Sequence, residues 1–448
     1  MTKTYREKLI LALKELNIIL PKGKYIKNDD LKQLIIDNLS PTNTNTNNNT
    51  NTNNNTNTNN NTNTNTNTNT NTNTNTNTNT NTNTNTNKKN KNNKKSELLG
   101  VDYKVNIKNS YFPTVKKLVA IGDIHGDLSV AIKSLKLAGV ININISNNTT
   151  NISNIKWTGG NTVVVQLGDQ IDRVRPSKLV NDLCTTNDDQ LNKDEGSDLK
   201  IICLFEKLNE EALKKGGALF SILGNHELMN VDGDFRYVSP KEFKEFGMFF
   251  KEPIKQSEYP YGYETRKRVF SPGGSLAKKL AASRYSILQI GSWIFVHGGI
   301  TSQMSSDYTI DQVNTIIYKW LNGNKSKLLM EHVNKIYHNE DENYSPFWSR
   351  VYGDMEEWNA HSQQEFYNTL NILNYKNKRE GNNEIKGMIV GHSPQFMYNK
   401  GLNSSCNNKL WRVDVGMSKA FGMDNNQDRK VQVLVIENDT NFKILKEE

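Results

Sequence analysis

The sequence predicts an α/β domain that extends from about Leu98 to the C-terminus of the 448-residue chain. In this region, apolar runs of strand length alternate with stretches whose apolar residues recur at helical spacing, which is typical of an α/β fold. Clusters of Gly, Asp, Asn and His follow several of these runs directly, where open α/β sheets gather their ligands. Upstream, the segment from Thr42 to Asn87 contains only Asn and Thr and therefore lacks apolar side chains for a core.

The chain divides into three predicted regions: a small helical module at residues 1–40, a disordered Asn/Thr-rich and Lys-rich linker at residues 41–97, and the α/β domain at residues 98–448. In the module, apolar residues recur at helical spacing between Leu9 and Leu16, and Asp29 precedes a second short helix. The module is either a helical hairpin that docks a partner or, by a weak resemblance, a SAP-like module that touches DNA.

Apolar runs locate the strands of the α/β domain. We expect strands at residues 117–121, 162–167, 218–223, 286–290, 293–296, 388–390, 411–415 and 431–436, of which 286–290 and 293–296 form a hairpin. Helices are expected at residues 128–138 and 199–215, the second of them stopped by a Gly pair. The polar stretches at residues 141–161 and 181–198 are expected to be surface insertions.

The formal net charge of +9 is unevenly distributed. Residues 1–97 carry 13 basic and 6 acidic side chains, a net charge of +7, which leaves +2 for the rest of the chain. The lysine run from Lys88 to Lys95 is either a weak contact for nucleic acid or a solvated, extended linker. The charge therefore does not mark the α/β domain itself as a nucleic-acid binder.

Cysteine usage and hydropathy indicate the compartment. The three cysteines, Cys184, Cys203 and Cys406, lack the spacing of a disulfide framework or of a metal knuckle, which favours a reducing environment. Neither a secretion signal nor an apolar run of membrane-spanning length is present in the sequence. We expect a soluble, cytoplasmic protein with no membrane partner.

Five clusters of hard-oxygen and imidazole side chains carry the chemistry, and four of the seven histidines lie in them. Carboxylates, amides and imidazoles together are what a catalytic divalent-metal site requires. Each residue alone has an ordinary structural interpretation, such as an Asn in a turn, but packing does not account for five such clusters after strands. The clusters are Gly122–Asp127, Gly168–Arg173, Gly224–Glu227, Val296–Gly299 and Gly391–Pro394.

These side chains can form a two-metal centre in which Asp169 bridges the ions. The expected ligands are Asp123, His125 and Asp169 for the first ion, and Asp169, Asn225, His297 and His392 for the second. Two ions about 3.5–4 Å apart polarise phosphoryl oxygens and turn a bridging water into a hydroxide that attacks phosphorus directly.

Hydrolysis of a phosphate ester also needs a proton for the leaving oxygen and positive charge near the phosphoryl group. His226, beside Asn225, can supply the proton, with Asp172 orienting its ring. Arg173 can grip the phosphate through its planar guanidinium. The clusters thus contain every group that metal-assisted phosphoester hydrolysis requires.

The five clusters resemble the signature motifs of the calcineurin-like metallophosphoesterases, specifically of the phosphoprotein phosphatase family. The resemblance covers about Lys117 to Ser418. Three further segments resemble the Shewanella-like, bacterial-type branch: Gly224–Asn230 with Gly233–Val238, Pro272–Ala277, and Arg412–Ser418. The resemblance implies a four-layer sandwich of two mixed β-sheets flanked by helices, with a dinuclear centre at one edge.

The same resemblance implies the ligand and proton-donor roles given above, with Asn225 also near the phosphate. It further implies a second phosphate-binding arginine, for which Arg350 is the first candidate and Arg236 the second. One departure from the family pattern is Val174, where a Gly usually follows the motif arginine. This substitution can shift the loop but removes no functional group.

We therefore expect a metal-dependent protein phosphatase that hydrolyses phosphomonoesters of Ser/Thr or Tyr in phosphoprotein substrates. Two divalent ions, Mn, Fe or Zn, are the expected cofactors, because Asp, His and Asn ligands accept each of these metals. The physiological substrate and the Ser/Thr against Tyr preference are left open by the sequence.

The sequence leaves three alternatives to consider. A dinucleoside polyphosphate hydrolase or another phosphoesterase could use the same centre, because fold and metals do not determine the substrate. A non-enzymatic scaffold acting through the basic N-terminal region would be expected to lack a ligand or the proton donor, and neither is missing. A cysteine phosphatase built on Cys406 and Arg412 is disfavoured, because the residues between them contain no Gly and run into a predicted strand.

Overall fold

The computed structural model describes residues 109–143, 151–175, 194, 196–354, 358–422 and 427–448. The predicted helical module at residues 1–40 and the predicted linker at residues 41–97 lie outside the described residues, as does Cys184. Those predictions stay untested.

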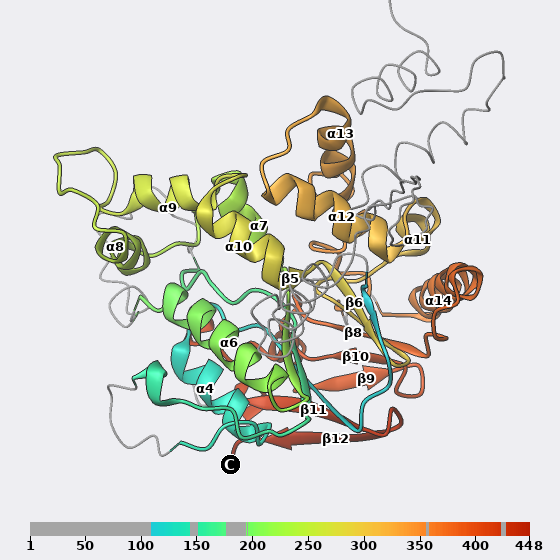
Figure 1. Ribbon diagram of the computed structural model, residues 1–448. Helices are drawn as coiled ribbons and strands as arrows, with labels where there is room; N and C mark the ends of the chain where they lie inside the picture. The colour runs from blue at the N-terminus through green and yellow to red at the C-terminus, as the bar shows by residue number, and fades with distance from the viewer. Residues whose placement is uncertain (1–108, 144–150, 176–193, 195, 355–357, 423–426) are drawn as a thin grey trace, which may run out of the picture. The chain divides into compact units, whose positions relative to one another are not determined.

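Two six-stranded sheets form the framework (Figure 1). Sheet A has the order β1-β6-β7-β8-β10-β9, formed by Tyr111–Phe112, Ile287–Ile290, Trp293–Val296, Gly387–Val390, Leu410–Arg412 and Asn403–Ser405. Sheet B has the order β12-β11-β2-β3-β4-β5, formed by Asn441–Lys446, Gln432–Glu437, Lys117–Ile121, Val163–Gln166, Ala218–Ile222 and Arg284–Tyr285. Both sheets are mixed, since parallel and antiparallel pairs occur in each.

The central strands are nearly continuous apolar runs because they are covered on both faces. Every residue of β3 is buried, and β3 pairs in parallel with β2 on one side and β4 on the other. Parallel strands in such a position read as unbroken Val, Ile and Leu runs in place of an alternating pattern. This is why the sequence predicts these strands well.

The helices flank the two sheets. They are α4 (Leu128–Leu137), α6 (Asp198–Leu213), α7 (Asn225–Asp232), α8 (Pro240–Phe249), α9 (Tyr263–Phe270), α10 (Ser275–Ser283), α11 (Ser302–Asp307), α12 (Ile310–Leu321), α13 (Lys327–Ile336) and α14 (Ala360–Glu380). In Figure 1, α4 and α6 lie beside sheet B, whereas α12 and α14 lie beside sheet A.

Alternation along β7 shows that sheet A separates two apolar cores. Ile294 and Val296 join the core that contains residues of α12 and α14, while Trp293 and Phe295 join the core shared with sheet B. A strand sends successive side chains to opposite faces, so both faces of β7 are packed. The predicted four-layer sandwich of two mixed sheets flanked by helices is confirmed.

The predicted strands and helices agree with the structure to within three residues at their ends. The strands β1, β5, β9 and β12 and the helices from α7 to α14 were not predicted. The description of residues 141–161 as a surface insertion is wrong in part, because Ile155 and Trp157 are buried and Trp157 forms a β-bridge with Ile141. The description of residues 181–198 is wrong at Asp198, which is buried at the start of α6.

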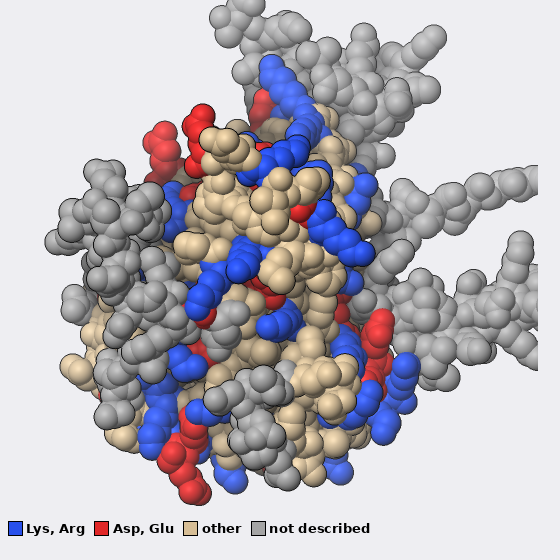
Figure 2. Space-filling view, turned by 90° about the vertical axis from the view of Figure 1, so that its left-hand side faces the viewer, with Lys and Arg blue, Asp and Glu red and all other residues tan. Residues whose placement is uncertain are grey.

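The described surface shows no single charged face in the view of Figure 2, where basic and acidic side chains are interspersed among uncharged ones. Among the described helices, none combines the length and the apolar composition that crossing a membrane requires.

Candidate metal centre

The strand ends of both sheets meet at one place. In sheet B, β2, β3 and β4 run parallel, so the residues after them, including Asp123, Asp169 and Asn225, lie at the same edge. In sheet A, β7 and β8 also run parallel and lead to His297 and His392. The centre is therefore built from the loops that follow five strands.

Glycine permits the close approach of these loops. Gly168 has a φ of +96°, and a Cβ there would lie 2.7 Å from the Gly224 backbone nitrogen and 2.9 Å from His297 Nδ1. No side chain fits in that space, and the conformation itself is one that L-residues rarely adopt. The clusters containing Asp169, Asn225 and His297 can therefore touch only because residue 168 is Gly.

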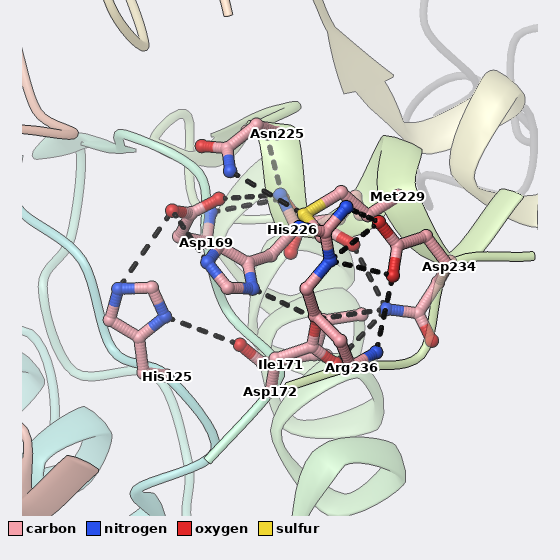
Figure 3. Close-up of polar contacts among 12 residues, drawn as sticks. His125, Asp169, Ile171, Asp172, Asn225, His226, Met229, Asp234 and Arg236 are labelled. Atoms are coloured by element: carbon pink, nitrogen blue, oxygen red, sulfur yellow. Dashed lines mark hydrogen bonds and ion pairs between the residues drawn. The ribbon is translucent and has the colours of Figure 1, made fainter. Parts of the chain in front are cut away.

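The first group of candidate ligands surrounds the imidazole of His125. Its Nε2 lies 3.9 Å from Asp123 Oδ2 and 3.8 Å from Asp169 Oδ2. The Nδ1 of His125 lies 3.4 Å from the Ile171 carbonyl oxygen, which leaves Nε2 directed at the Asp169 carboxylate (Figure 3). His125, Asp169 and His226 each offer an atom within 4.8 Å of the others.

The second group is tighter and shares Asp169 with the first. His297 Nε2 lies 3.2 Å from Asp169 Oδ2 and 2.9 Å from Asn225 Oδ1, and His297 Nδ1 donates to the Leu167 carbonyl at 2.7 Å. Ligand atoms about 2.0–2.2 Å from a common ion lie roughly 3 Å from one another, so this spacing suits one cation. His392 belongs to the same group.

Four residues of the centre have a strained backbone. His125, Asp169, Asp172 and His392 have φ values of +46°, +52°, +73° and +67°. Residues other than Gly hold such conformations at a cost of order 1–3 kcal/mol, which the surrounding structure must offset. Such strain at polar residues is typical of functional sites.

Three buried atoms support the fit of metal ions to these residues. Asp123 Oδ1, His392 Nε2 and Asp414 Oδ2 have no hydrogen-bond partner among the described residues. Buried polar atoms are normally paired, and an unpaired one indicates a missing water or ion. A divalent cation would satisfy these atoms, so the residues present fit the expected pair of ions.

The protonation states of His125 and His392 also suit metal binding. Burial, followed by the nearby Arg175 charge, holds the pKa of His125 well below its ordinary value. Burial and then Arg350 do the same for the pKa of His392. Both rings are thus neutral near pH 7, the form in which imidazole binds a metal.

The carboxylates of the centre repel one another. Burial, then Asp414 and Asp169, raises the pKa of Asp123 well above its ordinary value. Burial also raises the pKa of Asp414 to about 6 and raises that of Glu227. Cations would relieve this repulsion, because buried like charges are costly without a counter-charge.

Metal removal is therefore expected to destabilise the protein. At a free Mn²⁺ concentration about 100 times its dissociation constant, binding should add about 2.7 kcal/mol to the free energy of unfolding. Thermal unfolding at pH 7.5, followed by circular dichroism, should give a midpoint several degrees lower in EDTA than in Mn²⁺. Identical midpoints in EDTA and in excess Mn²⁺ would show that these carboxylates hold no cation.

His226 and Asp172 form the pair expected for proton transfer. The Nδ1 of His226 donates to Asp172 Oδ2 at 2.9 Å, and both residues are buried. The Nε2 of His226 lies 3.9 Å from Asp169 Oδ2, so this nitrogen faces the candidate ligands (Figure 3). The geometry suits a ring whose free nitrogen carries a proton toward the centre.

The three predicted phosphate-binding arginines lie in different environments. Arg173 is 1% exposed, and its Nη1 lies 3.7 Å from Asp194 Oδ1. Arg350 is exposed and donates from Nη1 to the His392 carbonyl at 3.2 Å. Arg236 points toward Asp234, with its Nε 2.9 Å from Asp234 Oδ2 (Figure 3). The roles of all three stay predictions.

Sequence reasoning assigned no role to residues that hold the centre in place. Glu227 accepts the backbone N–H groups of Asp169 at 2.9 Å, Gln170 at 2.8 Å and Gly224 at 2.8 Å, which ties two of the ligand loops together. Its position directly after His226, within the cluster Gly224–Glu227, could have indicated this role. Asp414, which follows β10, likewise lies within the segment Arg412–Ser418.

Asp172 is braced from a distant helix. Arg266, on α9, donates from Nη2 to Asp172 Oδ1 at 3.0 Å and to Asp198 Oδ2 at 2.8 Å. Asn230 donates to both carboxylate oxygens of Asp172 at 3.0 Å. The sequence around Arg266 contains no motif that signals this contact.

Comparisons with known proteins agree with this geometry. Residues 116–396 match the calcineurin-like phosphoesterase family. The chain is 29% identical over 367 residues to Shewanella-like protein phosphatase 2 of Arabidopsis thaliana, with 76% of this chain and 80% of that protein covered. It is 34% identical over 260 residues to an uncharacterised protein of Acanthamoeba polyphaga mimivirus, with 54% of this chain and 97% of that protein covered.

A crystal structure of a cold-active protein-tyrosine phosphatase from a psychrophilic Shewanella species matches with a TM-score of 0.48 and 20% identity, and the match covers 75% of this chain and 82% of that one. The family match extends over more than half of the chain and includes all five motif clusters. The chain belongs to the calcineurin-like phosphoesterase family, and its curated relatives support the Shewanella-like branch.

Proposed function

We propose that this protein is a metal-dependent protein phosphatase that hydrolyses phosphomonoesters on Ser/Thr or Tyr residues. The observation that carries the proposal is the pairing of two ligand groups through Asp169 with a proton-donor pair, His226 and Asp172, beside them. Two bound divalent ions, of Mn, Fe or Zn type, would supply Lewis acidity to phosphoryl oxygens and an activated water as the nucleophile.

The chain's own residues supply the remaining steps. Asp172 accepts a hydrogen bond from His226 Nδ1–H, which orients the ring so that its Nε2, in the imidazolium form, can donate a proton to the leaving oxygen. Arg266 and Asn230 hold Asp172 in place, so the ring cannot turn away. Asn225, at the N-terminus of α7, directs its Oδ1 toward His297 and thus toward the second ligand group.

A polar cleft beside the centre supports a peptide substrate. The cleft has a volume of about 760 Å³ and is lined by Trp348, Arg350, Asn343, His361 and Glu365 among others. The Trp348 ring lies 6.0 Å from the ring of His392, so the cleft opens next to the second ligand group. A phosphorylated side chain could enter the centre while the flanking peptide lies in this cleft.

The phosphoprotein assignment is supported by the names of two curated relatives, Shewanella-like protein phosphatases 1 and 2. A dinucleoside polyphosphate hydrolase remains the alternative within the enzyme class, because the same centre serves both kinds of substrate. Nothing in the described residues favours that alternative over a phosphopeptide.

Relative rates decide between these substrates. Protein of known metal content is expected to release phosphate from phosphoserine, phosphothreonine or phosphotyrosine peptides with a kcat/KM at least about tenfold above that for diadenosine tetraphosphate, because only the peptide fills the cleft. Phosphate release measures the rates on a panel of phosphopeptides. Chromatography of the nucleotide products measures the rate on diadenosine tetraphosphate. A preference for diadenosine tetraphosphate would exclude the protein-phosphatase assignment.

A further inference from the structure

Five side chains form a closed ring next to the first ligand group. The guanidinium carbon of Arg175 lies 4.8 Å from the ring centre of Phe421 and 5.4 Å from that of Tyr237. The Phe421 ring contacts His125 at 5.6 Å, and the Tyr237 ring contacts His226 at 4.7 Å between ring centres. The two histidine rings lie 4.8 Å apart, which closes the ring of contacts. Arg175 is therefore held beside the candidate metal ligand and the candidate proton donor.

Among the described residues, only Nη1 of the Arg175 guanidinium makes hydrogen bonds. Its Nη1 donates to the carbonyls of Asp172 at 3.2 Å and Val174 at 2.9 Å, and within the described residues these are the hydrogen bonds of the side chain. No ion pair joins it to a carboxylate in that part of the chain. The residue is only half-buried, so its other N–H groups stay accessible to a ligand.

Arg173, two residues earlier, is differently placed. It is 1% exposed, its Nη1 lies 3.7 Å from Asp194 Oδ1, and its backbone N–H donates to Glu242 Oε1 at 2.9 Å. A buried arginine paired with a carboxylate cannot leave that partner without a large desolvation cost. The motif arginine is thus engaged in the structure of the loop.

Val174 lies between Arg173 and Arg175 and fixes the loop that carries them. Val174 is buried, and its N–H donates to the Tyr237 carbonyl at 3.0 Å. A branched apolar side chain in place of the usual Gly anchors the loop here and removes its backbone freedom. The backbone of Arg175 therefore begins next to Tyr237, and its guanidinium lies over the rings of Tyr237 and Phe421.

The electrostatic influence of Arg175 reaches the centre. The Arg175 guanidinium carbon and the His125 ring lie 4.8 Å and 5.6 Å from the ring centre of Phe421, so the Arg175 charge lies near the first ligand group. Arg350 lies beside the second ligand group, where its Nη1 donates to the His392 carbonyl at 3.2 Å. Positive charge is therefore present beside both ligand groups, from Arg175 at the first and Arg350 at the second.

We propose that Arg175, in place of the motif arginine Arg173, contacts the substrate's phosphoryl oxygens on the side of the first ligand group. This inference rests on the proposed function, since it assumes a phosphoryl substrate. The planar guanidinium suits two oxygens of a phosphate at once. The aromatic pair and the two backbone carbonyls hold it in one orientation, so little entropy is lost when phosphate binds.

Binding of inorganic phosphate tests the assignment without relying on turnover. Isothermal titration of Mn²⁺-loaded protein should show phosphate affinity reduced roughly 10- to 100-fold in Arg175→Met, the range expected for hydrogen bonds to a charged group. Arg175→Lys should keep part of the affinity, because the charge remains while the fork is lost. Arg173→Met should change phosphate affinity less than threefold, and its cost should appear as a lower unfolding temperature.

The exposed Arg268 supplies the matched control, because Arg268→Met removes an arginine from α9 without touching the centre. Metal content and circular dichroism must match the wild type for each variant that is compared. If Arg175→Met folds poorly, Arg175→Lys alone still tests the proposal, since undiminished affinity in a folded, loaded protein contradicts it. Loss of affinity confined to Arg173→Met, with Arg175→Met unchanged, overturns the proposal.

The same experiment separates this inference from the proposed function. Wild-type activity on phosphopeptides decides the proposed function by itself. Phosphate affinity of the variants decides the role of Arg175 even if the natural substrate is another phosphate ester.

Discussion

Replacement of His226 by asparagine is expected to lower kcat for a phosphoserine peptide by about 10²- to 10⁴-fold, the usual contribution of general acid catalysis. An alkoxide is a poor leaving group, so its oxygen must receive a proton as the bond to phosphorus breaks. His226 Nε2 faces the ligand groups while Nδ1 is fixed by Asp172 at 2.9 Å. Asparagine has neither the ring nitrogen nor a titratable proton.

The leaving group provides the internal control for this prediction. An aryl phosphate with a strongly electron-withdrawing substituent leaves without protonation, so His226→Asn should slow its hydrolysis far less than that of phosphoserine. His338→Asn is the matched variant, because His338 is an exposed histidine just after α13, and its Nε2 lies 3.8 Å from Asp232 rather than near the candidate ligands. Equal losses on both substrates would argue against proton donation.

A second interpretation of His226 is that it binds a metal ion, and the metal content of the variant tests this. Its Nε2 lies close enough to His125 and Asp169 to serve as a ligand in place of a proton donor. A donor can be replaced without loss of metal, whereas removal of a ligand lowers metal affinity. Full metal occupancy in His226→Asn, combined with the leaving-group effect, would support the donor role.

The strands that carry the ligands were predictable because their burial on both faces leaves a strong pattern. The predicted strand at residues 117–121 coincides with β2, and the central β3 differs by one residue at each end. Strands β1 and β5 have two residues each, too few for any periodicity to emerge. The surface prediction was wrong for Trp157 because the sequence around it is polar, although its side chain packs into the core that sheet B shares.

The candidate ligands were predictable because each lies in a short motif directly after a strand. The groups that brace them come from elsewhere in the chain. Arg266 reaches Asp172 from a helix that lies 94 residues later, and only the packing of α9 brings the two together. Arg175 was missed for a different reason: the motif drew attention to Arg173, and the effect of Val174 on the loop depends on its contact with Tyr237.

Asp169 is the residue on which both ligand groups depend. Its Oδ2 lies 3.8 Å from His125 Nε2 and 3.2 Å from His297 Nε2, while its Oδ1 accepts the His226 backbone N–H at 3.0 Å. Burial alone would raise the pKa of Asp169, but the surrounding histidines, led by His297, lower it well below its ordinary value. The carboxylate is thus ionised and available to two cations at neutral pH.

Asp169→Asn should lower kcat by about 10³-fold or more and leave the protein with less than one tightly bound metal ion per chain. Asparagine keeps the shape and an acceptor for the His226 N–H but removes the negative charge that both cations share. Metal ions supply several kcal/mol of transition-state stabilisation, and each 1.36 kcal/mol corresponds to a factor of ten in rate. Elemental analysis of the purified protein and phosphate release from a phosphopeptide measure the two effects.

The change in metal content must be separated from a loss of folding. Asp232→Asn removes an exposed carboxylate at the end of α7 and should alter neither metal content nor rate. In EDTA, Asp169→Asn and wild-type protein should unfold cooperatively at similar temperatures, because neither then holds a cation. A variant that folds normally, binds two ions and keeps its rate would mean that Asp169 does not bridge the two groups, and the inference that one shared carboxylate organises the centre would have to be abandoned.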